Sequence, residues 1–354
     1  MTQVPESINN KKFAYDLDRV DWTAWVKARS LPAYRAGQIH RWIGRGIADP
    51  DEMTDMPLSL RAGLREEFDF QGLITENRLI SKLDGTRKYI FRLMDGNIIE
   101  SVLMKYHHGY SVCISSQAGC RMGCSFCAST GAGFGRNLTS GEMLAQVLRI
   151  ARDIDSRVGH VVIMGIGEPM DNLAEVKRFL LAANDQEGAN IGMRHISLST
   201  CGLVPEMLEF TDTGLPVTLS ISLHAPNDTI RRQLMPIARK YSLDELLSAC
   251  KHHINRTGRR IIFEYALISG INDQPEHARE LAARLRGLLC HVNLIPANEF
   301  EGGCYHQSGQ REIRTFLEIL EREGQSATIR RELGSDIMAA CGQLRRRLEE
   351  CATV

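Results

Sequence analysis

The sequence predicts an α/β fold, a partial (β/α)6 barrel preceded by a small helical N-terminal domain. Six short apolar segments after residue 109 each lead into an amphipathic segment, and this alternation is typical of a parallel sheet with helical crossovers. The first 75 residues instead repeat apolar side chains at helical spacing. A chain of 354 residues exceeds one ordinary domain, while six strand–helix units are too few for a closed eight-stranded barrel.

Residues 1–75 are expected to form the helical accessory domain. Its apolar positions form two groups with the helical pattern i, i+3, i+4, namely Trp22, Trp25 and Val26, and Ile39, Trp42 and Ile43. Pro32 and Pro57 punctuate the segment and are expected to separate its helices, because proline lacks the backbone N–H that a helix interior needs.

Residues 76–108 are expected to form a β-hairpin that links this domain to the barrel. The two strands are residues 89–94 and 98–104, both rich in β-branched and aromatic side chains. Asp95, Gly96 and Asn97 supply the turn between them, because these residue types tolerate the backbone conformations of tight turns.

The barrel is expected to span residues 109–330. Its six strands are residues 111–115, 160–165, 195–199, 217–224, 261–268 and 291–296. Two helix starts carry a capping box, Thr139 with Glu142 and Ser242 with Glu245, and Pro275 suits a first helical turn. In such folds, ligands and chemistry gather at the carboxyl ends of the strands. The remaining residues, 331–354, are expected to form a separate C-terminal segment.

The composition excludes several classes of protein. Lys and Arg number 43, equal to Asp and Glu, so the chain is not a globally basic nucleic-acid coat protein. No apolar run approaches the ~18 residues of a membrane span, and the first residues lack a basic and apolar signal. We therefore expect a cytoplasmic protein whose ten cysteines are reduced thiols that serve a metal or catalysis.

Three cysteines form the most informative pattern in the chain. Cys120, Cys124 and Cys127 are spaced C-x₃-C-x₂-C, in a glycine-containing loop directly after the first predicted barrel strand. Thiolates hold iron–sulfur clusters, and three of them on a four-iron cluster leave one iron open for another ligand. The alternative is a structural zinc site, for which His107 or His108 would supply the fourth ligand.

Beyond this loop, longer strings of the chain resemble a known family. These strings are residues 113–120 (CISSQAGC), 133–138 (GFGRNL), 164–169 (MGIGEP), 222–228 (SLHAPND) and 339–344 (AACGQL). Together with the cysteine spacing, they resemble the RlmN/Cfr family of radical S-adenosylmethionine (SAM) RNA methyltransferases, and more closely its RlmN branch. The likeness runs from about residue 20 to the last helix.

The resemblance implies a [4Fe-4S] cluster held by Cys120, Cys124 and Cys127, with SAM on the open iron. It also implies the SAM contacts Gly167, Glu168, Ser199, Ser222, Leu223, His224 and Asn298. The residues themselves are compatible with this role, since they lie at or just past the ends of predicted parallel strands. The Glu168 carboxylate can accept from an amino group, and the hydroxyl and amide side chains can bind ribose or a carboxylate.

The resemblance further implies a route for adding a methyl group to C2 of adenine, a ring carbon that is not nucleophilic. Cys341 would take a methyl group from one SAM, and a radical made from a second SAM would activate that methyl for addition to the base. Glu100 would then accept the ring proton and Cys113 would attack the Cys341 sulfur, which leaves a disulfide to be reduced before the next turnover. Without the resemblance, Glu100 reads as an exposed strand residue and Cys341 as a core cysteine.

The implied substrates are 23S rRNA and the adenosine beside the anticodon in tRNA, with an electron-donating reductant, no membrane and a monomeric enzyme. The helical N-terminal domain is the expected RNA-gripping element. Local basic clusters would neutralise phosphates, namely Arg231–Arg232, Arg239–Lys240, Arg256, Arg259–Arg260, Arg330–Arg331 and Arg345–Arg347. Two alternatives stay open: a Cfr-like enzyme that methylates C8 of adenine, and a zinc-binding RNA-binding protein without catalysis.

Overall fold

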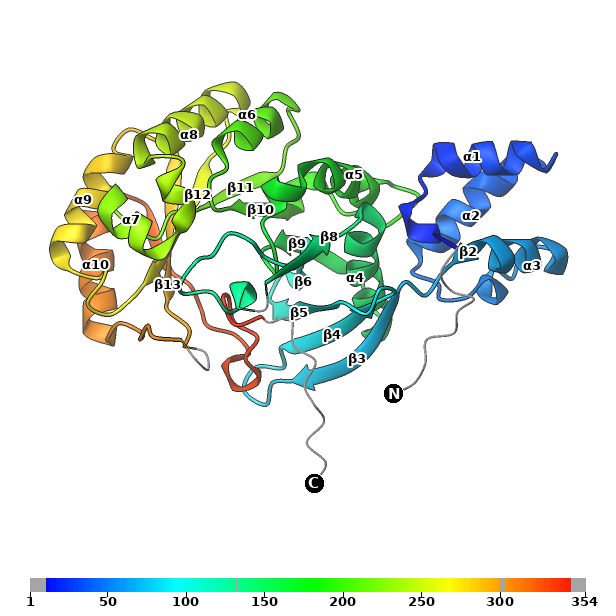
Figure 1. Ribbon diagram of the computed structural model, residues 1–354, viewed down its shortest axis with the longest axis horizontal. Helices are drawn as coiled ribbons and strands as arrows, with labels where there is room; N and C mark the ends of the chain where they lie inside the picture. The colour runs from blue at the N-terminus through cyan, green and yellow to red at the C-terminus, as the bar shows by residue number, and fades with distance from the viewer. Residues whose placement is uncertain (1–10, 132, 300–302, 345–354) are drawn as a thin grey trace.

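The computed structural model describes residues 11–131, 133–299 and 303–344, and it divides into a barrel and a smaller helical part (Figure 1). One sheet of ten strands runs through the barrel in the order β14-β13-β12-β11-β10-β9-β6-β5-β4-β3. From β6 (Gly109–Ile114) to β14 (Ala327–Ile329), all neighbouring strands pair in parallel. The predicted α/β fold with a partial parallel barrel is therefore confirmed.

The parallel strands agree with the six predicted segments, and a short seventh, β14, was not predicted. The others are β9 (Val158–Ile163), β10 (Ile196–Thr200), β11 (Thr218–Ser222), β12 (Ile261–Leu267) and β13 (Cys290–Pro296). The helices between them are α4 (Ser140–Asp153), α5 (Leu173–Asn184), α6 (Val204–Asp212), α7 (Asp228–Leu234), α8 (Leu243–Thr257), α9 (Pro275–Leu285) and α10 (Gln310–Arg322). Thr139 and Ser242 cap α4 and α8 as capping boxes, and Pro275 opens α9.

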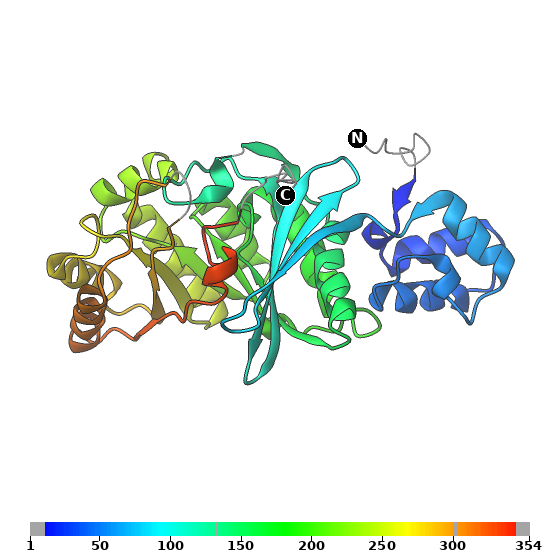
Figure 2. The same cartoon turned by 90° about the horizontal axis from the view of Figure 1, so that it is seen from below.

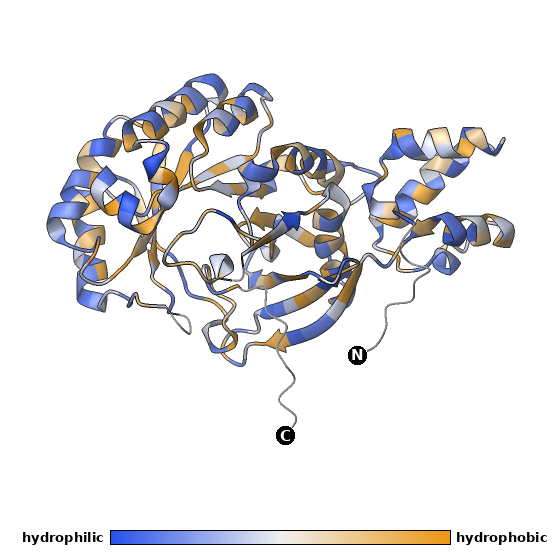
Figure 3. Cartoon of the chain, in the orientation of Figure 1, coloured by the Kyte–Doolittle hydropathy of each residue, from blue (hydrophilic) through white to orange (hydrophobic). Residues whose placement is uncertain are grey.

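The helical part is built on buried aromatic and aliphatic side chains, as the spacing predicts. Its helices are α1 (Arg19–Ala28), α2 (Tyr34–Gly44) and α3 (Leu58–Glu67), with short pieces β1 (Lys12–Phe13), η2 (Ala14–Asp16), η3 (Pro50–Glu52) and β2 (Phe68–Asp69). Trp22 and Ile39 are fully buried, and Trp22 packs against Phe68 with ring centroids 4.8 Å apart. Figure 3 shows that hydrophobic and hydrophilic residues alternate along these helices.

The hairpin predicted in residues 76–108 is present, but it is part of the sheet rather than a linker. Its strands are β4 (Arg87–Leu93) and β5 (Ile98–Tyr106), and β3 (Leu73–Ile80) adds an outer antiparallel strand. β5 also pairs antiparallel with β6, so the hairpin continues the barrel sheet. The domain boundaries at residues 75, 108 and 330 stay predictions.

A second small hairpin frames the cysteine loop. β7 (Gln117–Gly119) pairs antiparallel with β8 (Phe134–Asn137), and the short helix η4 (Ala128–Thr130) lies within the loop between them. Gly119 has a positive φ of 84°, and a Cβ there would lie 1.9 Å from the carbonyl oxygen of Gly133. Only glycine fits this close approach of two backbones.

The C-terminal segment lies across the sheet and closes a small core of its own. Leu333, Ala339 and Leu344 pack with Val102 and Cys113 in this core, separately from the main barrel core. Figure 2 shows the segment, coloured red, between the antiparallel strands and the cysteine loop. The turn between β3 and β4 holds its first part, since Lys82 N–H donates to Asp336 and Gly334 N–H donates to Asp84.

The remaining short elements are η5 (Pro169–Asn172), η6 (Met193–His195), η7 (Pro236–Arg239) and η8 (Ser335–Ile337). None of the helices in the described part of the chain combines the length and the apolar character that crossing a bilayer requires. The basic cluster Arg345–Arg347 and the end of the C-terminal segment lie outside the described residues.

Candidate active site

A large cavity opens at the carboxyl ends of the parallel strands. Its empty volume, counted together with its open mouth, is about 1140 Å³. Most of the sequence-predicted site residues line it: Cys120, Cys124, Cys127, Gly167, Glu168, Ser199, Ser222, His224, Asn298 and Cys341. We call this space the main cavity.

The three thiols of the cysteine loop lie at one end of the main cavity. Burial raises the pKa of Cys120 to about 12 and also raises the pKa values of Cys124 and Cys127. Thiolates at Cys120 and Cys127 would each raise the pKa of Cys124 further. Three partly buried thiols that interact in this way are unfavourable as thiolates by themselves, and the positive charge of the iron ions bound to them would offset that cost.

Gly167 allows the strand that follows the cysteine loop to approach that loop closely. Its φ is +112°, and a Cβ there would lie 2.6 Å from Cβ of Gln117. The Gln117 amide accepts from the Glu168 backbone N–H and donates to Asn137 and Asp171. One side chain therefore joins the base of the cysteine loop to the end of β9.

Glu168 is a buried carboxylate that is held by backbone donors. Oε1 accepts from Met170 N–H at 3.0 Å and Oε2 accepts from Cys201 N–H at 2.7 Å. Burial raises the pKa of Glu168, and these hydrogen bonds counteract part of that rise. The side chains of Thr200 and Cys201 also hydrogen bond to this carboxylate, which lines the main cavity.

His224 and Leu223 follow β11 but lie in different surroundings. His224 Nδ1 accepts from Ala266 N–H at 2.9 Å, which places the proton of the neutral ring on Nε2. Burial lowers the pKa of His224 to about 3, with a smaller effect of Arg231. Leu223, by contrast, packs in the barrel core and does not line the main cavity, so its side chain is not placed for the SAM contact expected of it.

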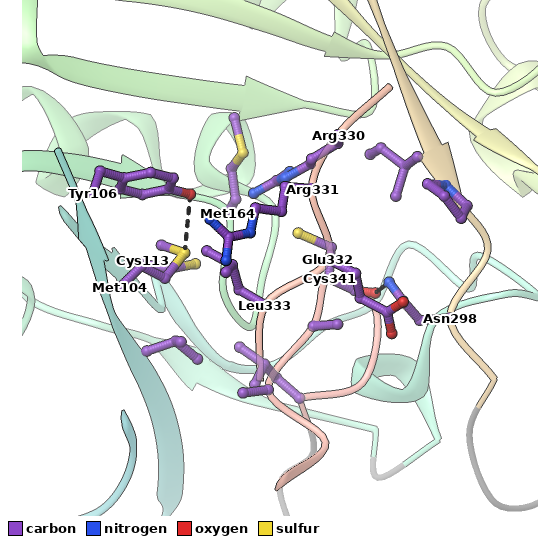
Figure 4. Close-up of a pocket in the computed structure, with 16 residues that line it drawn as sticks. Met104, Tyr106, Cys113, Met164, Asn298, Arg330, Arg331, Glu332, Leu333 and Cys341 are labelled. Carbon is purple, nitrogen blue, oxygen red and sulfur yellow. Dashed lines mark hydrogen bonds between the residues drawn. The ribbon is translucent and has the colours of Figure 1, made fainter. Parts of the chain in front are cut away.

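A second pocket adjoins the main cavity and holds both remote cysteines. Cys113 on β6 and Cys341 on the C-terminal segment line it together with Met104, Tyr106 and Arg330 (Figure 4). Both cysteines are free thiols in the structure, and burial raises the pKa of Cys113 to about 12. Cys341 lines the main cavity as well, so it stands where the two spaces meet.

Hydrogen bonds attach the segment around Cys341 to the cysteine loop. Ala128 N–H donates to the carbonyl of Gly342 at 2.8 Å, and the Ser129 hydroxyl donates to the carbonyl of Leu344 at 2.8 Å. On the other side, Asn298 Nδ2 donates to the carbonyl of Cys341 at 3.0 Å. Because the cysteine loop and Asn298 both hydrogen bond to backbone carbonyls of this segment, these contacts leave the Cys341 side chain free to face the cavity.

Glu100 lies next to this pocket without lining it. It shares one face of β5 with Val102 and Met104, which do line the pocket. Its carboxylate is 3.5 Å from Nζ of Lys88, and the two side chains are only 7% and 9% exposed. The same ammonium group donates to the carbonyl of Met338, three residues before Cys341.

Sequence analysis missed Glu264 as a site residue and assigned Arg330 only to a phosphate-binding basic cluster. Glu264 on β12 is buried, lines the main cavity and accepts from Asn293, and burial raises its pKa. Arg330 follows β14 and lines both cavities, with Nη1 3.9 Å from Glu264 Oε2. Charged residues on or just after a predicted parallel strand are candidates for a site, and this pattern could have indicated both. The strand before Arg330 has only three residues, which is too short to be recognised from the sequence.

The zinc alternative finds no support in the geometry. His107 and His108 precede β6, whereas the three cysteines follow its other end, and the six residues of β6 span about 20 Å. His108 stacks on Tyr106 and contacts His160 instead. Among the described residues, no three His, Cys, Asp or Glu side chains converge on one ion position.

Comparisons with known proteins agree with this site. Residues 114–282 match the Radical SAM superfamily. A probable dual-specificity RNA methyltransferase RlmN of Clostridium botulinum (strain Eklund 17B / Type B) is 52% identical over 324 residues, which cover 92% of this chain and 93% of that protein. The chain belongs to the RlmN family of radical SAM RNA methyltransferases.

Other members of the family and a solved structure extend the match over nearly the whole chain. A protein of the same name from Desulforamulus reducens is 50% identical over 343 residues, 96% of this chain and 98% of its own length. A crystal structure of a radical SAM methyltransferase from Sphaerobacter thermophilus has a TM-score of 0.92 at 43% identity and covers 95% of this chain. The resemblance drawn from the sequence motifs is confirmed, and this RlmN family member is an enzyme that methylates RNA.

Proposed function

We propose that this enzyme methylates C2 of an adenosine in 23S rRNA and of the adenosine beside the anticodon in tRNA, through an S-methylcysteine on Cys341. One observation carries the proposal: Cys341 opens both to the main cavity, beside the cysteine loop, and to the pocket of Cys113. A thiol in this position can accept a methyl group on one side and meet a second thiol on the other.

Cys120, Cys124 and Cys127 would hold a [4Fe-4S] cluster, and Glu168, His224 and the strand-end hydroxyls would bind SAM. When bound, the cluster supplies the electron for reductive cleavage of SAM, as the radical SAM family implies. Glu168 offers acceptor positions to an amino group, and the His224 Nε2–H offers a donor.

The chain's own residues then divide the remaining chemistry. Cys341 carries the methyl group and becomes joined to the adenine through a methylene. Glu100, held beside the pocket by Lys88, accepts the ring proton. The adduct must also give up one electron, which the cluster would accept. The Cys113 thiol then attacks the Cys341 sulfur, the sulfur–methylene bond breaks, and the methylene carbon takes up a proton to become the methyl group of methyladenine. This leaves a Cys113–Cys341 disulfide that a reductant must open again. Burial keeps the Cys113 thiol protonated until that step, since its pKa is raised to about 12.

RNA binding is supported by the named relatives, which are dual-specificity RNA methyltransferases. The exposed basic residues Arg239, Lys240, Arg256 and Arg260 can neutralise phosphates, whereas Arg231 is wholly buried and cannot contact RNA. An adenine must leave its stack to reach a thiol inside the barrel mouth, as in other base-modifying enzymes. The monomeric state, the cytoplasmic location and the identity of the reductant stay predictions.

Trapping the covalent stage tests the proposal. Cys113→Ala, reconstituted with iron, sulfide and SAM, should methylate Cys341, add it to RNA once and stop. A denaturing gel with labelled RNA should show a shifted protein–RNA band that vanishes when Cys341 is also replaced. Cys304→Ala, which changes an exposed thiol outside both cavities, is the matched control and should turn over normally. Continued turnover of Cys113→Ala without an adduct would refute the roles of the two thiols.

The position of the methyl group requires a separate measurement. Residues 136–138 and 293–296 resemble the C2 branch more than the C8 branch, and the relatives carry the RlmN name. Digestion of the product RNA and mass spectrometry against 2-methyladenosine and 8-methyladenosine standards separates the two isomers. Detection of 8-methyladenosine alone would establish the Cfr-like alternative.

A further inference from the structure

A buried arginine that takes no part in the proposed chemistry lies on α7, and the end of this helix is joined to the cysteine loop by a hydrogen bond from Ser125 N–H to the carbonyl of Leu234 at 2.9 Å. Arg231 lies on α7, is 0% exposed and does not line the main cavity. Its Nη2 donates to the carbonyl of Cys201 at 2.7 Å. Its Nε and Nη1 have no hydrogen-bond partner among the described residues.

A guanidinium in such surroundings is costly. Taking a cation out of water is unfavourable unless an anion and hydrogen bonds replace its hydration, and here a single carbonyl does so. Burial accordingly lowers the pKa of Arg231 from its ordinary value. The groups that would stabilise the cation are thiolates at Cys201 and Cys124 and, with a smaller effect, the carboxylate of Asp228 on the same helix. Cys124 is one of the three proposed cluster ligands.

The proposed cofactor would add negative charge at Cys124. A four-iron cluster in its ordinary oxidised state, held by three thiolates, is an anion overall, and one-electron reduction makes it more negative. We propose that Arg231 is the buried counter-charge of this cluster and raises its reduction potential. The proposal rests on the proposed function, because it takes Cys124 as a cluster ligand.

The sign of the effect follows from the charges. A fixed positive charge stabilises the reduced cluster more than the oxidised one, so it favours uptake of an electron from a low-potential one-electron donor. The burial of Arg231 keeps this interaction from being screened by water and salt. Arg232, the next residue on the same helix, is exposed, so its charge should have little influence on the cluster.

Arg231→Met and the matched control Arg232→Met test this difference. Both variants and the wild-type protein are reconstituted anaerobically, and the reduced cluster is titrated by electron paramagnetic resonance against solution potential. Arg231→Met should show an equilibrium constant for reduction at least tenfold lower, equal to about 59 mV for one electron. Arg232→Met should stay within twofold of wild type. A loaded Arg231→Met with an unchanged potential would overturn the proposal.

Arg231→Lys separates charge from shape. It keeps a cation at the same place, so its potential should stay closer to wild type than that of Arg231→Met. If Arg231→Met cannot be loaded with iron, loading of Arg231→Lys supports the counter-charge and failure of both variants refutes it. A wild-type protein that binds no cluster would instead refute the proposed function, so the two failures are distinguishable.

Discussion

Replacing Gly119 by alanine should distort the hairpin that carries the cysteine loop. Gly119 precedes Cys120 directly, and its φ of +84° costs an L-residue about 1–2 kcal/mol. The new Cβ would also lie 1.9 Å from the carbonyl oxygen of Gly133 and 3.0 Å from its carbonyl carbon. Forcing these backbones apart adds about 1–3 kcal/mol, so the total loss of folding free energy should be about 2–5 kcal/mol.

Gly133→Ala isolates the steric part of this loss. Gly133 also has a positive φ, of 70°, but nothing lies within 4 Å of the Cβ that alanine would add. Thermal denaturation should therefore give Gly119→Ala a melting temperature several degrees below that of Gly133→Ala. Iron content after reconstitution should fall in Gly119→Ala and stay near wild type in Gly133→Ala. Equal losses in the two variants would refute the reasoning from the close backbone approach.

Three further results are expected. Burial lowers the pKa of His224 to about 3 in the folded protein, against 6.5 in the unfolded chain. The unfolded chain therefore binds a proton that the folded protein does not, so the stability of the fold is greatest above pH 6.5 and falls as the pH is lowered toward 3. Between pH 7.5 and 5.5, the free energy of unfolding of the wild-type protein should fall by about 1.4 kcal/mol more than that of His224→Gln. Chemical denaturation at the two pH values measures this, and an equal fall in both proteins would contradict it. Glu168→Gln should weaken SAM binding in equilibrium dialysis at unchanged iron content; joint loss of both would indicate a folding role. Alanine at Cys120, Cys124 and Cys127 together should abolish iron binding and 5′-deoxyadenosine formation, and any deoxyadenosine from that variant would exclude these ligands.

Much of the fold could be predicted because its signals are local. The capping boxes at Thr139 and Ser242, the turn at Asp95 and the alternation of strands and helices depend on residues within a few positions of one another. The cysteine spacing is equally local, and the longer motifs are each short enough to indicate the family from the sequence by itself. The strand β14 escaped notice because three residues are too few to show a period.

Only the tertiary structure shows which residues distant in the sequence come together and which side chains are buried. Cys113 and Cys341 meet in one pocket only because the C-terminal segment is held between the hairpin and the cysteine loop. Arg231 and Arg232 are neighbours of identical type in the sequence, yet packing buries the first and leaves the second exposed. Burial and the approach of distant residues depend on how the whole chain packs. They determine that Cys113 and Cys341 share a pocket and that the guanidinium of Arg231 is removed from solvent.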